Sequence, residues 1–277
     1  MSKTVIMVCA HKQDECLNRP PYMPVQVGRA VSGVDLGFRT DDTGDNISAR
    51  NRNYCELTAH YWAWKNLKDA DYIGLNHYRR YFDFGSDLCN VVTAGTREFF
   101  DAEHPVPDFD ELFGHFDIVM PKPKVYAYNL WCDYAKCHRE EDLEVLRTVV
   151  AERHPEYLDA FDWVFFRNNR LSHFNMFVMQ RAKFDAYSEW LFDILFEVER
   201  RVEIPSDPVQ ARIFGYMSER LLMVYARHNR WRISYRTVVM VDDRKKKGAA
   251  SYLFHYAMNN LMYAVTYPFR RRSPARG

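Results

Sequence analysis

An α/β fold is predicted by three features of this 277-residue sequence. Residues 5–10 form a short apolar run rich in β-branched side chains, which is typical of a buried strand. An amphipathic segment at 54–68 and a strand-like run at 72–75 follow, and this order indicates an α/β sandwich. Hydrophobic residues make up 47% and charged residues 27% of the chain, so it can bury a large core with little disorder.

The first half of the chain contains one strong helix signal and one weaker strand signal. The weaker strand candidate lies within residues 25–34, and a loop rich in Asp, Asn and Gly follows at 39–54. The helix is expected from about 54 to 68, with Asn53 as its N-cap and Glu56 completing a capping box.

The second half continues to mix strands and helices. Residues 83–113 have the composition of a variable region with a short helix at 96–102. The remaining predicted elements are strands at 117–120, 173–179 and 231–241 and helices at 138–152, 182–201 and 213–225. No linker divides these segments, so we predict one domain over residues 1–241, followed by a basic tail at 242–277.

The C-terminal tail differs from the rest of the chain in charge. The whole sequence has a net charge of +1, and residues 242–277 hold eight Lys or Arg against two Asp, so the tail is +6 and residues 1–241 are about −5. Between two basic clusters, apolar side chains recur at helical spacing: Leu253, Tyr256, Ala257, Leu261 and Ala264, between Lys245–Lys247 and Arg270–Arg272. Such a segment can lie on an anionic membrane surface. The alternative is a final helix packed on the core with a frayed basic end.

The cysteines and the N-terminal segment indicate a reducing compartment. Six cysteines occur without a CxxC pair, and the apolar run at 5–10 is too short for the core of a signal peptide. No segment reaches the length of a membrane-spanning helix. We therefore expect a cytoplasmic protein with free thiols. Cys132, Cys137 and His138 could be imagined as metal ligands, but no fourth ligand is apparent.

The first candidate site follows the strand at 72–75. Asn76, His77, Arg79 and Arg80 lie where that strand ends, and open α/β sheets bind ligands beyond the carboxyl ends of their strands. Arginine side chains can offer forked donors to a diphosphate. Neighbours on an extended chain point to opposite faces, so only one Arg need face a ligand while the other pairs with an Asp. The alternative is a strand end that carries surface charge.

Two further candidates are polar residues in unexpected settings. Asp45 and Asn46 lie in the loop before the helix at 54–68, where capping does not account for them. His173 and Asn175 lie in a strand made otherwise of large apolar residues, and a buried Asn needs a partner or a ligand. An Asn satisfied within the core is the equal alternative.

The last candidates flank predicted helices. Glu219 is a candidate general base near a helix start marked by Gly215, and Arg212 precedes it. A structural ion pair of Glu219 with Arg212 or Arg220 is the alternative. His138 precedes a helix with an acidic first turn and could point into a cleft.

Several common site motifs do not occur. The sequence has no GxGxxG after the first strand, no P-loop, no HExxH and no GxSxG, which disfavours dehydrogenases, NTPases, zinc proteases and α/β-hydrolases. The excess of basic residues is confined to the tail and no RNA- or DNA-binding module is visible, so we expect no nucleic-acid partner.

Six segments occur in the order seen in one known family. They are GDNIS, NYCELTAHYWAWKNL, DYIGLNHYRRYF, DIVMPKP, HFNMFVM and GYMSERLL, and the match runs over about residues 5–225. The sequence resembles a glycosyltransferase family of capsular polysaccharide, exopolysaccharide and O-antigen gene clusters, long described only as a domain of unknown function. Some of its members are β-1,3-galactofuranosyltransferases.

The resemblance implies a GT-A-like fold, a single Rossmann-type domain with a mixed central sheet flanked by helices, here with a C-terminal helical basic tail. GT-A enzymes commonly carry a DxD motif that ends the strand after the helix and holds a divalent metal ion through the diphosphate. In this sequence residues 76–80, NHYRR, stand at that place without a carboxylate. We therefore expect no metal site, with basic and polar side chains in its place, and Mn²⁺ or Mg²⁺ as the alternative.

The function that the resemblance implies is an inverting transfer of a hexose, such as galactofuranose or galactose, from a UDP-sugar to a lipid-linked or polymeric glycan. A location on the inner face of the cell membrane is compatible with the tail. The expected catalytic residues are Glu219 and His77, the donor-binding residues Asp45, Asn46, Asn76, Arg79 and Arg80, and the acceptor-binding residues His138, His173, Asn175 and Arg212. His77 is also expected to contact the donor diphosphate. The alternative is a non-catalytic sugar-nucleotide or glycan-binding protein of a biosynthetic complex.

Overall fold

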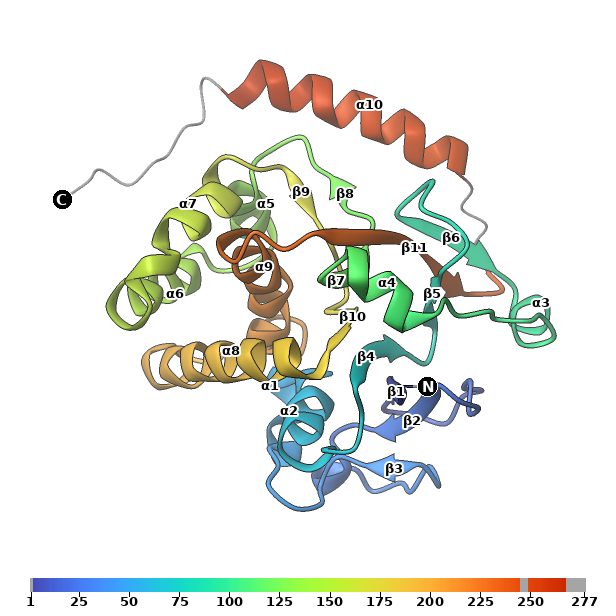
Figure 1. Ribbon diagram of the computed structural model, residues 1–277. Helices are drawn as coiled ribbons and strands as arrows, with labels where there is room; N and C mark the ends of the chain where they lie inside the picture. Colours follow the sequence, from blue (N-terminus) through green and yellow to red (C-terminus); the bar gives the residue numbers. More distant parts are fainter. Residues whose placement is uncertain (1, 245–248, 268–277) are drawn as a thin grey trace.

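The computed structural model describes residues 2–244 and 249–267 of the chain. The predicted basic clusters Lys245–Lys247 and Arg270–Arg272 lie outside these residues. A central mixed sheet of nine strands has helices against both faces (Figure 1), which confirms the predicted α/β class.

The sheet is ordered β10-β7-β11-β5-β4-β1-β2-β3, with β6 beside β11. Its strands are β1 (Thr4–Ala10), β2 (Tyr22–Gln26), β3 (Arg39–Thr40), β4 (Tyr72–His77), β5 (Arg80–Asp83), β6 (Val91–Ala94), β7 (Ile118–Pro121), β10 (Phe177–Gln180) and β11 (Ile233–Val241), and β8 (Lys124–Val125) pairs with β9 (Arg170–Leu171) separately. β1 is parallel to β2 on one side and to β4 on the other, whereas β10 is antiparallel to β4 and β7. After β1 the chain therefore adds β2 on one side of that strand and later β4 on the other side. Such a reversal in strand order is a topological switch point, and α/β sheets bind ligands at switch points.

Helices form a layer on each side of the sheet. They are α1 (Asn51–Tyr54), α2 (Leu57–Asn66), α3 (Thr96–Phe100), α4 (Phe109–His115), α5 (Leu130–Cys137), α6 (Glu140–Arg153), α7 (Leu158–Phe166), α8 (Arg181–Arg201), α9 (Ile213–His228) and α10 (Ala249–Thr266), with 3₁₀ turns η1 (Arg29–Val31), η2 (Ser48–Arg50), η3 (Pro155–Tyr157) and η4 (Gln210–Arg212). α2 and α5 to α9 enclose the larger core, and α3 and α4 enclose the smaller core on the opposite face (Figure 1).

The two cores take alternate residues of the central strands. The odd-numbered residues of β1 enter the larger core and the even-numbered ones the smaller core, as strand geometry requires. Gly74 on β4 allows β10 to approach closely, since a Cβ there would lie 2.9 Å from Val178 Cγ2 and 3.0 Å from the Phe177 carbonyl oxygen. The absence of a side chain at Gly74 therefore lets β4 and β10 pack closely in the centre of the sheet.

The helix predicted at 54–68 is interrupted, and the capping prediction is wrong. Cys55 adopts φ 52° and ψ −130°, so α1 ends before it and α2 begins after Glu56. Asn53 lies inside α1 and its Nδ2 donates to the Ala211 carbonyl at 2.9 Å, and the side chain of Glu56 makes no capping hydrogen bond. Asn53 and Glu56 have the spacing of a capping box, but the positive φ of Cys55, which lies between them, prevents a continuous helix.

The strand predicted at 173–179 is also shorter than expected. β10 begins only at Phe177, because Phe174 and Asn175 both have positive φ, 76° and 51°, and turn the chain before the strand. β2 likewise lies mostly ahead of the strand predicted within 25–34. α5 and α7 were not predicted.

The helix predicted in the C-terminal tail is present as α10, which lies against β6 and β8 at one edge of the molecule (Figure 1). Over the described parts of the chain, no helix combines the length and the apolar character needed to cross a bilayer.

Candidate active site

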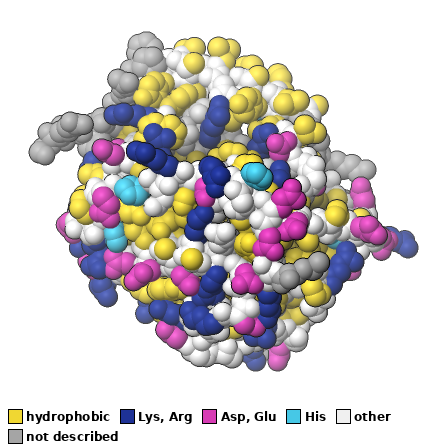
Figure 2. All heavy atoms as spheres, in the orientation of Figure 1, with side chains coloured by type: hydrophobic (Ala, Val, Ile, Leu, Met, Phe, Trp, Pro, Cys, Tyr) yellow, Lys and Arg dark blue, Asp and Glu magenta, His cyan; other side chains and the backbone are white. Residues whose placement is uncertain are grey.

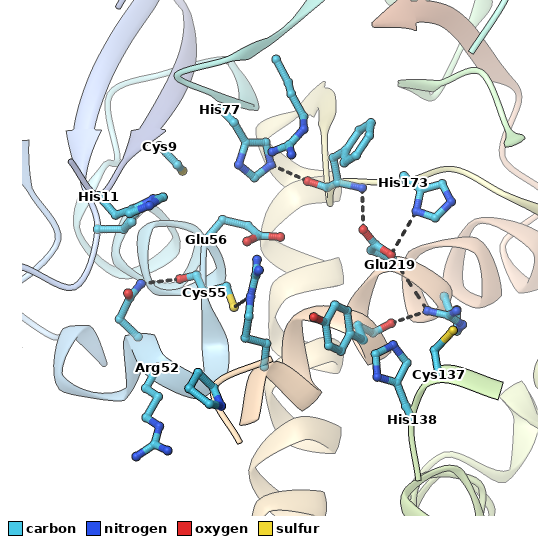
Figure 3. A pocket seen from close by; sticks show the side chains of 18 of the residues that line it. Cys9, His11, Arg52, Cys55, Glu56, His77, Cys137, His138, His173 and Glu219 are labelled. Carbon is cyan, nitrogen blue, oxygen red and sulfur yellow. Dashed lines mark hydrogen bonds and ion pairs between the residues drawn. The ribbon is translucent and has the colours of Figure 1, made fainter. Parts of the chain in front are cut away.

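A cavity of about 860 Å³ opens at the carboxyl ends of β1 and β4 (Figure 3). Cys9 and His11 reach it from the end of β1 and His77 from the end of β4, while α9 and the junction of α1 and α2 supply other walls. Its charged lining residues are Arg52, Glu56, Arg80, Lys124, Asp133, Arg212, Glu219 and Arg220. The position fits the switch point of the sheet, and the lining favours a charged, polar ligand.

Glu56 reaches the cavity because the chain is kinked at the residue before it. The Cys55 carbonyl accepts hydrogen bonds from Asn51 Nδ2 at 2.8 Å and Thr58 Oγ1 at 3.0 Å, which hold the kink in place. Gly215 leaves room for the Cys55 side chain, since a Cβ on that glycine would lie 3.3 Å from Cys55 Sγ. The kink turns the Glu56 carboxylate into the cavity (Figure 3).

Asn175 fixes one oxygen of the Glu56 carboxylate. Its Nδ2 donates to Glu56 Oε1 at 2.6 Å and to the Gly215 carbonyl at 3.1 Å, and its Oδ1 accepts from Ser218 Oγ at 2.8 Å. Asn175 is buried and does not line the cavity, so its polar groups are satisfied within the protein. Glu56 Oε2 has no hydrogen-bond partner among the described residues. One oxygen of the carboxylate is therefore anchored and the other is open to a ligand.

Glu219, in contrast, is engaged through both oxygens. Oε1 accepts the Phe174 backbone N–H at 2.6 Å, and Oε2 lies 3.5 Å from His173 Nδ1 and 4.0 Å from Arg220 Nη1. Burial alone would raise the pKa of Glu219, but His173, Arg220 and the Phe174 N–H together hold that pKa below its usual value. This ionised carboxylate lines the cavity and also stabilises the turn before β10, as in the ion-pair alternative.

His77 and Arg80 form a polar wall where β4 passes into β5. His77 Nε2–H donates to the Phe174 carbonyl at 2.7 Å, and burial lowers the pKa of His77, so the neutral ring keeps Nδ1 as an acceptor. The Arg80 guanidinium carbon lies 4.7 Å from the centre of the Phe174 ring. Over the described residues, Arg80 Nε is buried without a hydrogen-bond partner and no carboxylate forms an ion pair with Arg80. An unpaired, half-buried guanidinium is suited to an anionic ligand.

The adjacent Arg79 and Asn76 do not line the cavity. Arg79 Nε donates to Asp14 Oδ2 at 2.8 Å, which confirms the expectation that one of the two arginines pairs with an Asp. Asn76 precedes His77 on an extended strand and therefore faces the other side of the sheet, where it is fully buried. Its Nδ2 and Oδ1 have no partner in the described part of the chain. Of the three donor-binding residues predicted in this segment, Arg80 is the one that lines the cavity.

Asp45 and Asn46 also lie outside the cavity lining. Asp45 Oδ1 accepts from the Tyr61 hydroxyl at 3.1 Å, and Asn46 Oδ1 accepts from the Ser48 backbone N–H at 3.1 Å. Asn46 therefore shapes the loop before α1, and Asp45 ties this loop to Tyr61 on α2. These hydrogen bonds account for the polar pattern that suggested a donor site.

The cavity brings together three of the predicted acceptor-binding residues. His138 Nδ1–H donates to Gln210 Oε1 at 2.9 Å, and its ring centre lies 4.2 Å from that of Tyr216. His173 Nε2 lies 2.6 Å from the Tyr126 hydroxyl, and Arg212 Nε donates to Cys55 Sγ at 3.2 Å. All three line the cavity.

Sequence reasoning missed two carboxylates of the cavity. Glu56 was attributed to capping, although Asn175, a polar residue among large apolar ones, signalled that some buried partner must exist. Asp133 on α5 lies 3.5 Å from Arg220, and burial raises the pKa of this carboxylate. No sequence signal identified Asp133, because α5 was not predicted.

Residues that could hold a metal ion are not grouped in the described structure. Within residues 2–244 and 249–267, no cluster of three or more His, Cys, Asp and Glu side chains has a suitable arrangement. This includes Cys132, Cys137 and His138, the set considered from the sequence.

The fold is similar to that of a solved glycosyltransferase. The apo structure of WbbM, a bifunctional glycosyltransferase, superimposes with a TM-score of 0.76 at 30% sequence identity, covering 89% of this chain and 46% of that one. The chain thus spans less than half the length of this neighbour. Among curated proteins, none matches the sequence significantly. Residues 5–230 match the family described as "Domain of unknown function (DUF4422)", and the chain belongs to that family.

Proposed function

We propose that the protein is a glycosyltransferase that moves a sugar from a UDP-sugar to a hydroxyl of a growing glycan with inversion at the anomeric carbon. The acceptor oxygen forms a bond to that carbon while the bond to the β-phosphate oxygen breaks and UDP leaves. The similarity to WbbM supports sugar transfer in general. The large cavity, with a carboxylate beside an unpaired guanidinium, supports a donor and an acceptor bound together.

The open oxygen of Glu56 is the observation that carries this proposal. Inverting transfer needs a base that removes the proton of the acceptor hydroxyl as its oxygen attacks. Glu56 Oε1 is anchored by Asn175 and Oε2 is available, so the carboxylate is oriented without being saturated. We therefore assign the base to Glu56 in place of Glu219. Glu219 becomes a positioning residue, because it holds Phe174, whose carbonyl accepts from His77 and whose ring lies beneath Arg80.

On the donor side, Arg80 would bind the diphosphate. Negative charge develops on the β-phosphate as UDP leaves, and a forked guanidinium can donate two hydrogen bonds to it. His77 is oriented by the Phe174 carbonyl and presents Nδ1 as an acceptor for a donor hydroxyl. On the acceptor side, His138, His173 and Arg212 line the cavity and supply polar contacts to the glycan.

The proposal extends to fold type and cofactor. The parallel arrangement of β1, β2 and β4 with the cavity at their carboxyl ends supports a GT-A-like domain over residues 1–241. The segment after β4 carries Arg80 where a metal-binding carboxylate would be expected, which supports a metal-independent transfer. Undiminished transfer after EDTA treatment is the expected result, and loss that Mn²⁺ restores would contradict it.

The sugar and the acceptor follow from the resemblance of the sequence. We propose galactofuranose or galactose as the transferred sugar and a lipid-linked or polymeric glycan of capsule, exopolysaccharide or O-antigen type as the acceptor. Such acceptors are assembled at the inner face of the cell membrane, so a cytoplasmic enzyme that works at that surface is expected.

Release of UDP tests the proposal. The protein would be incubated with UDP-galactofuranose, UDP-galactose or UDP-glucose, with and without a glycan acceptor, and UDP would be measured. We expect acceptor-dependent UDP release by the wild type and its loss in Glu56→Gln, with Glu15→Gln, an exposed carboxylate outside the cavity, as control. A protein that binds a UDP-sugar but releases no UDP would be a non-catalytic binder and would overturn the proposal.

A further inference from the structure

α10 presents its polar side to the protein and its apolar side outward. Tyr252 Oη donates to the Pro123 carbonyl at 3.4 Å, Asn259 Nδ2 to the Val125 carbonyl at 2.8 Å, and Thr266 Oγ1 to the Ala127 carbonyl at 3.2 Å. A helix on the surface of a water-soluble domain normally has the opposite arrangement.

The outward side of α10 is defined here by six large apolar residues, called the outer face: Leu253, Phe254, Met258, Leu261, Met262 and Val265. Phe254 is 64% exposed, Val265 61% and Leu261 60%. α10 contains no Asp, Glu, Lys or Arg from residue 249 to 266, so no charged side chain of its own interrupts this face. Figure 2 shows hydrophobic side chains gathered along the edge of the molecule where α10 lies. A continuous apolar surface of this kind marks a contact with another apolar phase.

The charge of the flanking sequence indicates which phase this is. Residues 244–277 contain eight Lys or Arg and no Asp or Glu. An apolar helix face between basic segments is complementary to an anionic lipid surface, where side chains enter the headgroup region and cations meet lipid phosphates. A second copy of this chain is disfavoured, because residues 244–277 carry eight positive charges in each copy and like charges repel.

A second cavity lies between α10 and the candidate active site. It has a volume of about 600 Å³ and is lined on one side by Tyr252, His255, Tyr256 and Asn259 of α10. On the other side it is lined by Lys124, His173 and Phe174, which also line the candidate active site. The inner side of α10 therefore borders a cavity that adjoins the proposed sugar-transfer site, and Lys124 is a cation in the lining of both cavities.

We propose that the outer face of α10 inserts into the interfacial region of an anionic lipid bilayer. The cavity beneath α10 would then form a passage from the membrane surface to the proposed transfer site and admit the polar part of a lipid-linked acceptor. The passage rests on the proposed function, whereas the membrane contact itself does not.

Vesicle binding tests the membrane contact independently of activity. The full chain would be sedimented with vesicles of phosphatidylcholine alone and of phosphatidylcholine with phosphatidylglycerol, at low and high salt. We expect binding to the anionic vesicles that weakens with salt. Phe254→Glu/Leu261→Glu is expected to reduce the affinity about tenfold or more, because two exposed apolar side chains no longer enter the lipid. UDP release with a water-soluble acceptor is expected to be unchanged.

Val34→Glu/Val209→Glu is the matched control, since both valines are exposed but lie away from α10. It should bind vesicles like the wild type, and circular dichroism should show that all variants are folded. Equal vesicle binding by the α10 variant and the wild type would overturn the proposal. So would absence of vesicle binding together with a dimer, seen by light scattering, that the α10 variant abolishes, because that result assigns the outer face to a second copy. Unchanged vesicle binding by a protein without transferase activity would contradict the proposed function alone.

Discussion

Glu56 and Glu219 are two carboxylates of the same cavity with opposite surroundings. Glu56 accepts one hydrogen bond from a side chain among the described residues and leaves one oxygen open, whereas Glu219 is held by a backbone N–H, an imidazole and a guanidinium. We infer from the difference that a half-buried carboxylate in a cleft is not by itself a catalytic group. The number of its internal partners distinguishes a group that acts on a ligand from one that supports the cavity.

The largest expected effect concerns the chemical step. Replacing the proposed base by Glu56→Gln removes the proton acceptor with little change in shape, so kcat should fall by about 10²–10⁴-fold. Glu219→Gln should lower kcat much less, because its amide oxygen can still accept the Phe174 N–H. Acceptor-dependent UDP release by the two variants measures both effects. The reverse ranking would show that the base is Glu219.

A second comparison tests the donor site through Arg80, which lies near both carboxylates and has no ion pair in the described structure. Arg80→Lys keeps the charge but loses the planar fork, so the KM for the UDP-sugar should rise about 10–100-fold, equivalent to about 1.4–3 kcal/mol of lost binding. Arg79→Lys is the matched control, since Arg79 pairs with Asp14 outside the cavity. Equal KM changes in the two variants would mean that Arg80 does not contact the donor.

The third prediction concerns the free energy of unfolding. Glu219→Gln should reduce it more than Glu56→Gln does, the reverse of the order expected for kcat. Glu219→Gln weakens charge-assisted hydrogen bonds in the interior, so the free energy of unfolding should decrease by about 1–3 kcal/mol. Glu56→Gln should change it by less than about 0.5 kcal/mol, because its amide oxygen can still accept from Asn175. Urea unfolding followed by tryptophan fluorescence gives both values. A larger loss in Glu56→Gln would assign Glu56 a structural role.

The smallest effect is a dependence on pH. The pKa of Glu219 is lower in the folded chain than its ordinary value of 4.5, so its contribution to stability is present above that value and is lost as the pH falls through the folded pKa. The stability difference between the wild type and Glu219→Gln should therefore be constant near neutral pH and narrow below about 4.5. Urea unfolding at a series of pH values measures this difference, with Glu56→Gln as control. A difference that stays constant down to pH values well below 4.5 would contradict the assignment.

Local periodicity predicted the α/β class and most of the long elements. β1, α8, α9 and β11 have strong apolar patterns, and they appear close to their predicted positions. The prediction was weakest where backbone conformation is set by distant contacts. Cys55, Phe174 and Asn175 all have positive φ, which is uncommon for Cys and Phe, and the kink and the turn they make shape the cavity.

The candidate site was predictable only in part, because the sequence shows which side chains are polar but not which distant groups they contact. The cavity is lined by six of the predicted site residues: His77, Arg80, His138, His173, Arg212 and Glu219. Asp45, Asn46 and Arg79 made equally polar patterns, but their partners lie within the protein: the Tyr61 hydroxyl on α2, the Ser48 backbone N–H and the Asp14 carboxylate. Glu56 was not predicted as a site residue because its spacing from Asn53 fits a capping box. Only its contact with Asn175, which is distant in sequence, shows how the carboxylate is oriented.

The backbone of Cys55 has a consequence for evolution and engineering of this protein. A residue with a side chain held at φ 52° and ψ −130° costs on the order of 1–3 kcal/mol, and glycine would adopt that conformation readily. Selection for thermal stability alone should therefore favour Cys55→Gly. The same change would remove the sulfur to which Arg212 donates, so the kink that aims Glu56 would lose this contact and keep the hydrogen bonds to its backbone carbonyl. Heat tolerance and turnover are thus expected to oppose each other at this one position.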